Sequence, residues 1–137
     1  MRFTITIDSN LWIYYVDRGL PEHRAAAKAV RRALDGPVLI NTNVQLEVAH
    51  YLIKRFGAVA GTEKMAPFLS VPFVVDPLDE EAVHLALEFF RRYADVGIGG
   101  RDAALLASMK RRGSKELWTH DGAFRRIPEI KVFDPCA

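Results

Sequence analysis

Cysteine is almost absent from this sequence, with Cys136 as the only one among 137 residues. A single cysteine cannot form a disulfide within the chain, which excludes the disulfide-stabilised folds of small secreted proteins. Such low cysteine usage fits a reducing compartment, so we expect a cytoplasmic protein.

Long apolar runs are also absent. No run approaches the length of about 20 residues that a membrane-spanning helix needs. The apolar stretch from Phe3 to Ile7 is too short for the core of a signal peptide and predicts a strand instead. Because repeats, low-complexity tracts and linkers are lacking too, we expect one domain over residues 1–137, without membrane contact.

A strong charge of either sign is the third absence. The sequence has 19 Lys and Arg against 17 Asp and Glu, a net charge of +2. That charge is too small to indicate a nucleic acid, a membrane surface or any other class of partner. Half of the residues are apolar and 26% are charged, as in ordinary globular proteins. Function must therefore be sought in individual residues.

Hydrophobic periodicity predicts short strands that alternate with helices. The predicted strands are 3–7, 38–40, 73–75, 117–119 and 130–133. The predicted helices are 11–16, 21–34, 42–56, 58–69, 79–90 and 101–112, with a glycine-rich loop at 96–100. Pro21 is expected in a first helical turn, and Thr42 and Asp79 are expected as N-caps. This order indicates an α/β fold, a doubly wound and mostly parallel sheet of about five strands with helices on both faces.

Four acidic residues lie near the end of a predicted strand or the start of a predicted helix. Asp8 directly follows the first strand, and Asp121 lies just beyond the fourth. Glu47 lies about one turn into the helix after the second strand, and Asp102 opens the helix after the glycine-rich loop. Because doubly wound sheets bind ligands beyond the carboxyl ends of their strands, we expect these four carboxylates to meet there.

Three of these acids also have a structural explanation. Carboxylates near a helix start interact favourably with the helix dipole, which could account for Glu47 and Asp102. Asp8 could cap the short helix that follows it, although an unpaired acid beside a buried strand is costly. Converging like charges need a compensating cation, and oxygen ligands without Cys or His favour Mg²⁺ or Mn²⁺ over zinc. The four acids together therefore predict a metal site.

The segments around these acids resemble four motifs of the PIN-domain family, and within it the VapC-type ribonuclease toxins of toxin–antitoxin systems. In this sequence the motifs read IDSNLW at 7–12, TNVQLEV at 42–48, GRDAALLA at 100–107 and LWTHDGAF at 117–124. The resemblance covers nearly the whole chain in the family's order, although residues 58–95 contribute only pattern and length.

What the resemblance implies is a PIN-like endoribonuclease that hydrolyses RNA phosphodiester bonds with Mg²⁺ or Mn²⁺. Asp8, Glu47 and Asp102 would bind the metal, and Asp121 would join them directly or through water. The resemblance further implies a homodimer and a small antitoxin protein as a partner. Asn10 would support the acids by hydrogen bonding.

Thr119, like Asn10, matches a family motif and would hydrogen-bond the acids, although both residue types are also common in turns. His50 and His120 lie near acids, but a surface or packing role is the more common one. The basic residues at 110, 111, 112 and 115 lie at the end of a predicted helix, where cations are favoured, and we predict that they are mostly structural. Arg125 remains open as an RNA contact.

Other functions stay open on the sequence. A phosphatase with Asp8 as nucleophile would need a second acid at the position of Asn10. A phospho-accepting receiver domain would need paired acids after the first strand and a better acceptor than Asp76, which precedes a proline. A PIN scaffold that only binds is disfavoured because all four acids are present. Among active PIN proteins, RNA processing in ribosome maturation is the alternative to a toxin.

Overall fold

Five parallel strands form one sheet in the computed structural model, which describes residues 3–137. The strands are β1 (Ile5–Ile7), β2 (Val38–Asn41), β3 (Val74–Asp76), β4 (Glu116–Trp118) and β5 (Lys131–Phe133). Their order across the sheet is β3-β2-β1-β4-β5, and each neighbouring pair is parallel. The predicted α/β fold with a sheet of about five strands is therefore confirmed.

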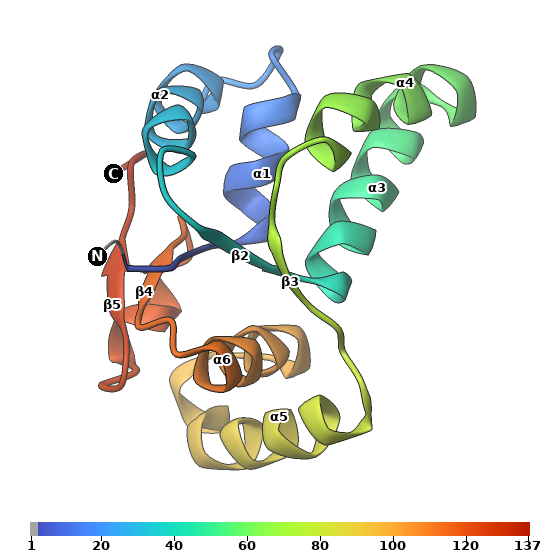
Figure 1. Cartoon of the computed structure of the whole chain (residues 1–137). Helices are drawn as coiled ribbons and strands as arrows, with labels where there is room; N and C mark the ends of the chain where they lie inside the picture. The colour runs from blue at the N-terminus through green and yellow to red at the C-terminus, as the bar shows by residue number, and fades with distance from the viewer. Residues whose placement is uncertain (1–2) are drawn as a thin grey trace.

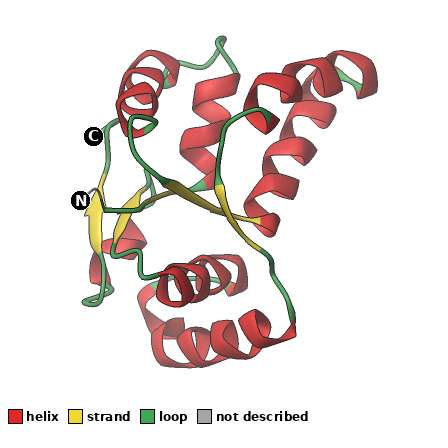
Figure 2. Ribbon diagram, viewed as in Figure 1, coloured by secondary structure: helices red, strands yellow, loops and turns green. Residues whose placement is uncertain are grey.

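Helices cover both faces of this sheet. They are α1 (Ser9–Val16), α2 (His23–Ala33), α3 (Thr42–Phe56), α4 (Ala58–Leu69), α5 (Glu80–Tyr93) and α6 (Gly100–Arg112), with short 3₁₀ turns η1 (Ala94–Val96) and η2 (Gly122–Arg126). Figure 1 shows α1 to α4 on one side of the sheet and α5 and α6 on the other, and Figure 2 shows the short strands between these two layers. In the part of the chain that the structure describes, no helix has the length and apolarity to cross a membrane.

The core lies between the sheet and each helical layer. Strand β2 is buried along its whole length because helices cover both of its faces. Trp12 and Phe124 are fully buried in the core. The indole N–H of Trp12 donates to the carbonyl of Ile7 at 3.1 Å, so its polar atom is satisfied inside the core.

The chain reverses its direction across the sheet between β1 and β4. Strands β2 and β3 are added on one side of β1, and β4 and β5 then lie on the other side. The N–H of Asp8 donates to the carbonyl of Trp118 at 2.9 Å, which holds the carboxyl ends of β1 and β4 side by side. Such a reversal point is where doubly wound sheets bind ligands.

The predicted starts of α1 and α2 and the predicted N-cap of α3 are wrong in detail, and α1 begins at Ser9 rather than at Leu11. Asn41, not Thr42, caps α3, because its side chain accepts a backbone N–H of the first turn at 2.8 Å. The hydroxyl of Thr42 instead accepts the N–H of Leu78 at 3.0 Å and links α3 to the loop after β3. Pro21 lies before α2, which begins at His23.

The end of β3 is held by a charged cluster. Asp76 is fully buried, and its Oδ1 accepts from the guanidinium groups of Arg111 at 2.9 Å and Arg112 at 2.8 Å. Asp79 caps α5 as predicted, accepting the N–H of Ala82 at 2.9 Å. Arg111 and Arg112 therefore have the structural role predicted for their group, since they join the end of α6 to β3.

Candidate active site at the strand ends

A cavity of about 430 Å³ opens beside the carboxyl ends of β1 and β4, and all four predicted acids line it. These residues are Asp8, Glu47, Asp102 and Asp121. Asp8 follows β1, Glu47 comes from α3, Asp102 comes from the first turn of α6, and Asp121 precedes η2. The fold thus brings together four side chains that are far apart in the sequence.

Asp8 is the most buried of the four acids, with 8% of its surface exposed. Its Oδ1 accepts the N–H of Ser9 at 2.7 Å, and its Oδ2 accepts the hydroxyl of Thr119 at 2.8 Å. Burial raises the pKa of Asp8 from its ordinary 3.8 to about 6, against these hydrogen bonds and with added repulsion from Asp102 and Glu47. Asp8 both caps α1 and lines the cavity, so its role as a helix cap is compatible with a role in a metal site.

Glu47 is held by contacts to both of its oxygens. Its Oε1 accepts the side-chain amide of Asn43 at 3.1 Å, and its Oε2 accepts the hydroxyl of Ser9 at 3.3 Å. The guanidinium of Arg101 lies 3.6 Å from Oε2. Partial burial raises the pKa of Glu47, and the positive charge of Arg101 acts in the opposite direction.

Asp102 and Asp121 each use one oxygen to stabilise local backbone. Oδ2 of Asp102 accepts the N–H of Gly99 at 2.9 Å at the start of α6. Oδ1 of Asp121 accepts the N–H of Ala123 at 3.0 Å at the start of η2. Burial is the main cause that raises the pKa of Asp102, and the charge of Asp121 raises it further. Asp102 therefore stabilises the start of α6 and also lines the cavity.

The hydroxyl of Thr119 makes hydrogen bonds to Asp8 and to two other residues at the site. Its buried hydroxyl donates to Asp8, accepts the side-chain amide of Asn10 at 3.3 Å and accepts the N–H of Asp121 at 3.0 Å. Asn10 also accepts the N–H of His120 at 3.3 Å through its side-chain oxygen. Thr119 therefore contacts an acid directly, whereas Asn10 reaches Asp8 only through Thr119.

The two histidines near the acids do not line the cavity. His50 lies in a neighbouring groove, and Nδ1 of His120 is 2.7 Å from a carboxylate oxygen of Asp134. Sequence reasoning missed Arg101 and Asn43, which both contact Glu47. Asn43 could have been found from the sequence, because it lies four residues before Glu47 and residues four apart on a helix are neighbours. Arg101 could not have been found in this way, since its partner Glu47 is distant in the sequence.

The chemistry of the four acids fits a divalent cation with oxygen ligands. Burial raises the pKa of Asp8, Glu47 and Asp102, and their mutual repulsion adds to it. A divalent ion would relieve both effects. Over residues 3–137, no three Asp, Glu, His or Cys side chains are already arranged to hold a metal ion. A divalent ion held by these acids would therefore need their side chains to adopt positions other than those of this structure.

Comparisons with known proteins agree with the fold. The PIN domain family profile matches residues 5–130. Ribonuclease VapC48 of Mycobacterium tuberculosis is 27% identical over 95% of this chain and 96% of its own length. The crystal structure of M. tuberculosis VapC20, a sarcin–ricin loop cleaving toxin, has a TM-score of 0.77 at 23% identity, covering 93% of this chain and 98% of that one. A chain of a toxin–antitoxin complex from Klebsiella pneumoniae has a TM-score of 0.73 at 20% identity, covering 96% and 97%. By its sequence profile and its fold, this chain belongs to the PIN domain family.

Proposed function

We propose that this chain is a Mg²⁺- or Mn²⁺-dependent endoribonuclease and the toxin of a toxin–antitoxin pair. The observation that supports this function best is the convergence of four carboxylates on one cavity in a PIN-domain chain. The relatives add support, because VapC48 is named a ribonuclease and VapC20 a toxin that cleaves the sarcin–ricin loop. In this proposal residues 1–137 act as one nuclease domain in the cytoplasm.

In the proposed reaction the four acids act together as metal ligands. Asp8, Glu47 and Asp102 hold the ion, and Asp121 completes the set directly or through water. A bound Mg²⁺ or Mn²⁺ lowers the pKa of a water molecule and neutralises charge on the leaving oxygen of a phosphodiester. Thr119 holds the carboxylate of Asp8 in one orientation, as partners of metal ligands commonly do.

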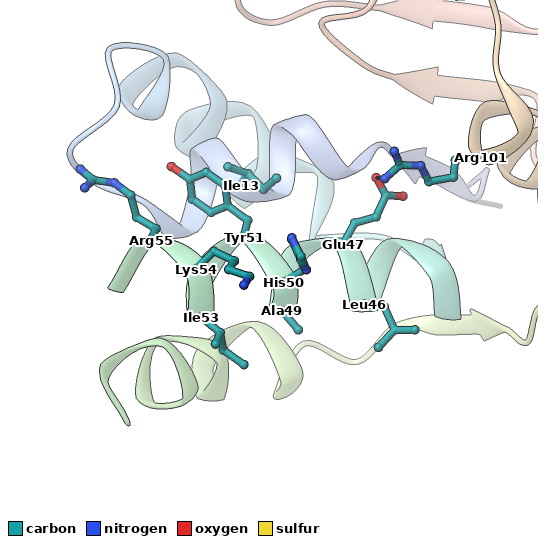
Figure 3. A pocket seen from close by; sticks show the side chains of 10 residues that line it. All are labelled: Ile13, Leu46, Glu47, Ala49, His50, Tyr51, Ile53, Lys54, Arg55 and Arg101. Atoms are coloured by element: carbon teal, nitrogen blue, oxygen red, sulfur yellow. Dashed lines mark ion pairs between the residues drawn. The ribbon is translucent and has the colours of Figure 1, made fainter. Parts of the chain in front are cut away.

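An apolar groove beside the acids supports an antitoxin partner. The groove, of about 960 Å³, runs along α3, and apolar side chains of Ile13, Leu46 and Ile53 line it (Figure 3). Glu47 and Arg101 line both the groove and the acid cavity. A protein segment bound in this groove would therefore reach the edge of the site. The similar Klebsiella chain comes from a toxin–antitoxin complex.

A stripe of exposed apolar residues supports the proposed homodimer. Val83, Leu87 and Phe90 follow helical spacing on α5 and are 42%, 56% and 38% exposed. Contiguous apolar surface of this kind usually marks a protein interface. Light scattering at micromolar concentration should give the mass of a dimer, and a monomer mass would contradict this part of the proposal.

Cleavage of RNA by the purified chain tests the main proposal. A single-stranded RNA pool should be cut in the presence of Mg²⁺ or Mn²⁺, and EDTA should stop the reaction. An Asp8→Asn protein purified in the same way controls for contaminating nucleases. Full activity in EDTA would reject the metal dependence. Absence of cleavage despite metal binding would favour a scaffold that only binds.

A further inference from the structure

Arg101 lines both the acid cavity and the apolar groove, and the place where the two share lining residues is called the passage. It extends from α6 toward α3, where its guanidinium lies 3.6 Å from Oε2 of Glu47 (Figure 3). Of the residues that line the cavity and the groove, only Arg101 and Glu47 are common to both. The Arg101 side chain is 75% exposed, whereas that of Glu47 is 24% exposed. A phosphate of a substrate held at the acids would therefore lie near this pair.

Helix stability does not explain an arginine at this position. Arg101 is in the first turn of α6, where the helix dipole disfavours a positive charge. Asp102, the next residue, already supplies the acid that favours this helix start. An ion pair as exposed as the one between Arg101 and Glu47 adds little to the stability of the fold. The fold therefore does not depend on Arg101, which leaves its side chain available for another role.

The chemistry of the guanidinium offers such a role. Arginine binds carboxylates and phosphates through the same planar set of N–H donors. Without an ion, the positive charge of Arg101 partly compensates the carboxylate of Glu47. A divalent ion at the acids would take over that compensation and repel the guanidinium, since both are positive. The released group would then face the passage as a donor for a phosphate.

We propose that Arg101 exchanges partners during function, pairing with Glu47 in the metal-free chain and binding a phosphate of the RNA strand once a divalent ion is held by the acids. This inference rests on the proposed ribonuclease function and deepens it. Arg101 competes with the ion for Glu47 and contributes to substrate binding only after the ion has entered. The site is therefore kept from binding RNA tightly before it can cut.

Metal affinity of the RNA-free protein is the first test. Isothermal titration with MnCl₂ should show Arg101→Gln binding the ion about three- to tenfold more tightly than wild type, because a nearby positive charge is gone. The matched control is Arg31→Gln, an exposed arginine on α2, which lies on the opposite face of the sheet from α6 (Figure 1). Because Arg101 is exposed, the variant should keep the wild-type melting temperature without metal. Equal Mn²⁺ affinity in the two variants would overturn the proposal.

Substrate affinity is the second test, with a fluorescein-labelled single-stranded RNA at saturating Mn²⁺. Arg101→Gln should raise KM by about tenfold and change kcat by less than about threefold, the pattern of a lost binding contact. Arg101→Lys should recover part of this loss, since it keeps the charge without the planar donor set. A KM for Arg101→Gln equal to that of Arg31→Gln, with wild-type cleavage intact, would reject the role of Arg101 alone. No cleavage by wild type would reject the proposed function itself, and this inference with it.

Discussion

Two strands of the sheet are followed or closed by a buried carboxylate, Asp8 after β1 and Asp76 at the end of β3, but their surroundings differ. Asp76 is fully buried and accepts from the guanidinium groups of Arg111 and Arg112 at 2.9 and 2.8 Å. Asp8 accepts from a neutral hydroxyl and a backbone N–H, and its charged neighbours in the cavity include the acid Glu47.

This difference separates a structural acid from a candidate ligand. A buried charge is tolerated when opposite charges within the protein compensate it, as they do at Asp76. The charged groups that affect the pKa of Asp8 are Asp102 and Glu47, which have the same sign, so a bound cation would supply the compensation that Asp8 lacks. Carboxylates with strongly raised pKa values in a cavity are candidates for function on physical grounds. Position at a strand end alone does not distinguish the two acids.

RNA cleavage should differ most between the variants of Asp8 and Asp76. Asp8→Asn should lower the RNA cleavage rate by about 100- to 1,000-fold, the size of effect seen when one preorganised charge-stabilising group is lost. Asp76→Asn should retain most of the activity per folded molecule, because its side chain does not line the cavity. Rates measured on the same RNA, at a temperature where both variants are folded, test this. Equal losses in the two variants would contradict it.

Stability should show the opposite contrast. Asp76→Asn leaves two guanidinium groups without their carboxylate and should lower the free energy of unfolding by about 3 kcal/mol. Asp8→Asn removes one of several like charges and should be at least as stable as wild type in EDTA. Urea unfolding of the three proteins measures both values. A destabilised Asp8→Asn protein would indicate that Asp8 acts mainly as a structural acid.

Asp8 should contribute to the pH dependence of the free energy of unfolding. Its pKa in the folded chain is raised from 3.8 to about 6, so folding favours the protonated form. The resulting contribution is present below pH 3.8 and is lost as the pH rises through about 6, by up to about 3 kcal/mol. In EDTA, wild type should lose stability relative to Asp8→Asn over this window. Urea unfolding at several pH values checks this, and a constant difference would argue against the raised pKa.

Binding of a metal ion to the acids of the cavity should stabilise the folded chain, and this stabilisation should depend on Asp8 but not on Asp76. Mn²⁺ at concentrations well above its Kd should stabilise wild type by about 2 kcal/mol, since the ion binds the folded state. Asp76→Asn should gain as much, whereas Asp8→Asn should gain much less. Melting curves with and without Mn²⁺ measure these shifts. Equal shifts in wild type and Asp8→Asn would reject a site that includes Asp8.

Local patterns in the sequence predicted the elements well where one face of an element is buried. The bounds of α4 (Ala58–Leu69) agree with the prediction, and Asp79 caps α5 as expected. The N-cap of α3 was predicted wrongly because two neighbouring residues are both suited to that position. Asn41 and Thr42 are both good N-caps, and only the contact of Thr42 with Leu78 decides between them. Strand β3 begins one residue later than predicted because its exposed residues form a weak pattern.

The sequence by itself determined the α/β class and which acids end a strand or open a helix, because these features depend on neighbours along the chain. Only the tertiary structure decided which acids are compensated. Asp76 meets Arg111 across 35 positions, and Glu47 meets Arg101 across the passage between cavity and groove. Such pairs depend on the order of strands and on how α3 and α6 pack against the sheet. Electrostatic compensation acts through space, so a one-dimensional pattern of charges does not contain it.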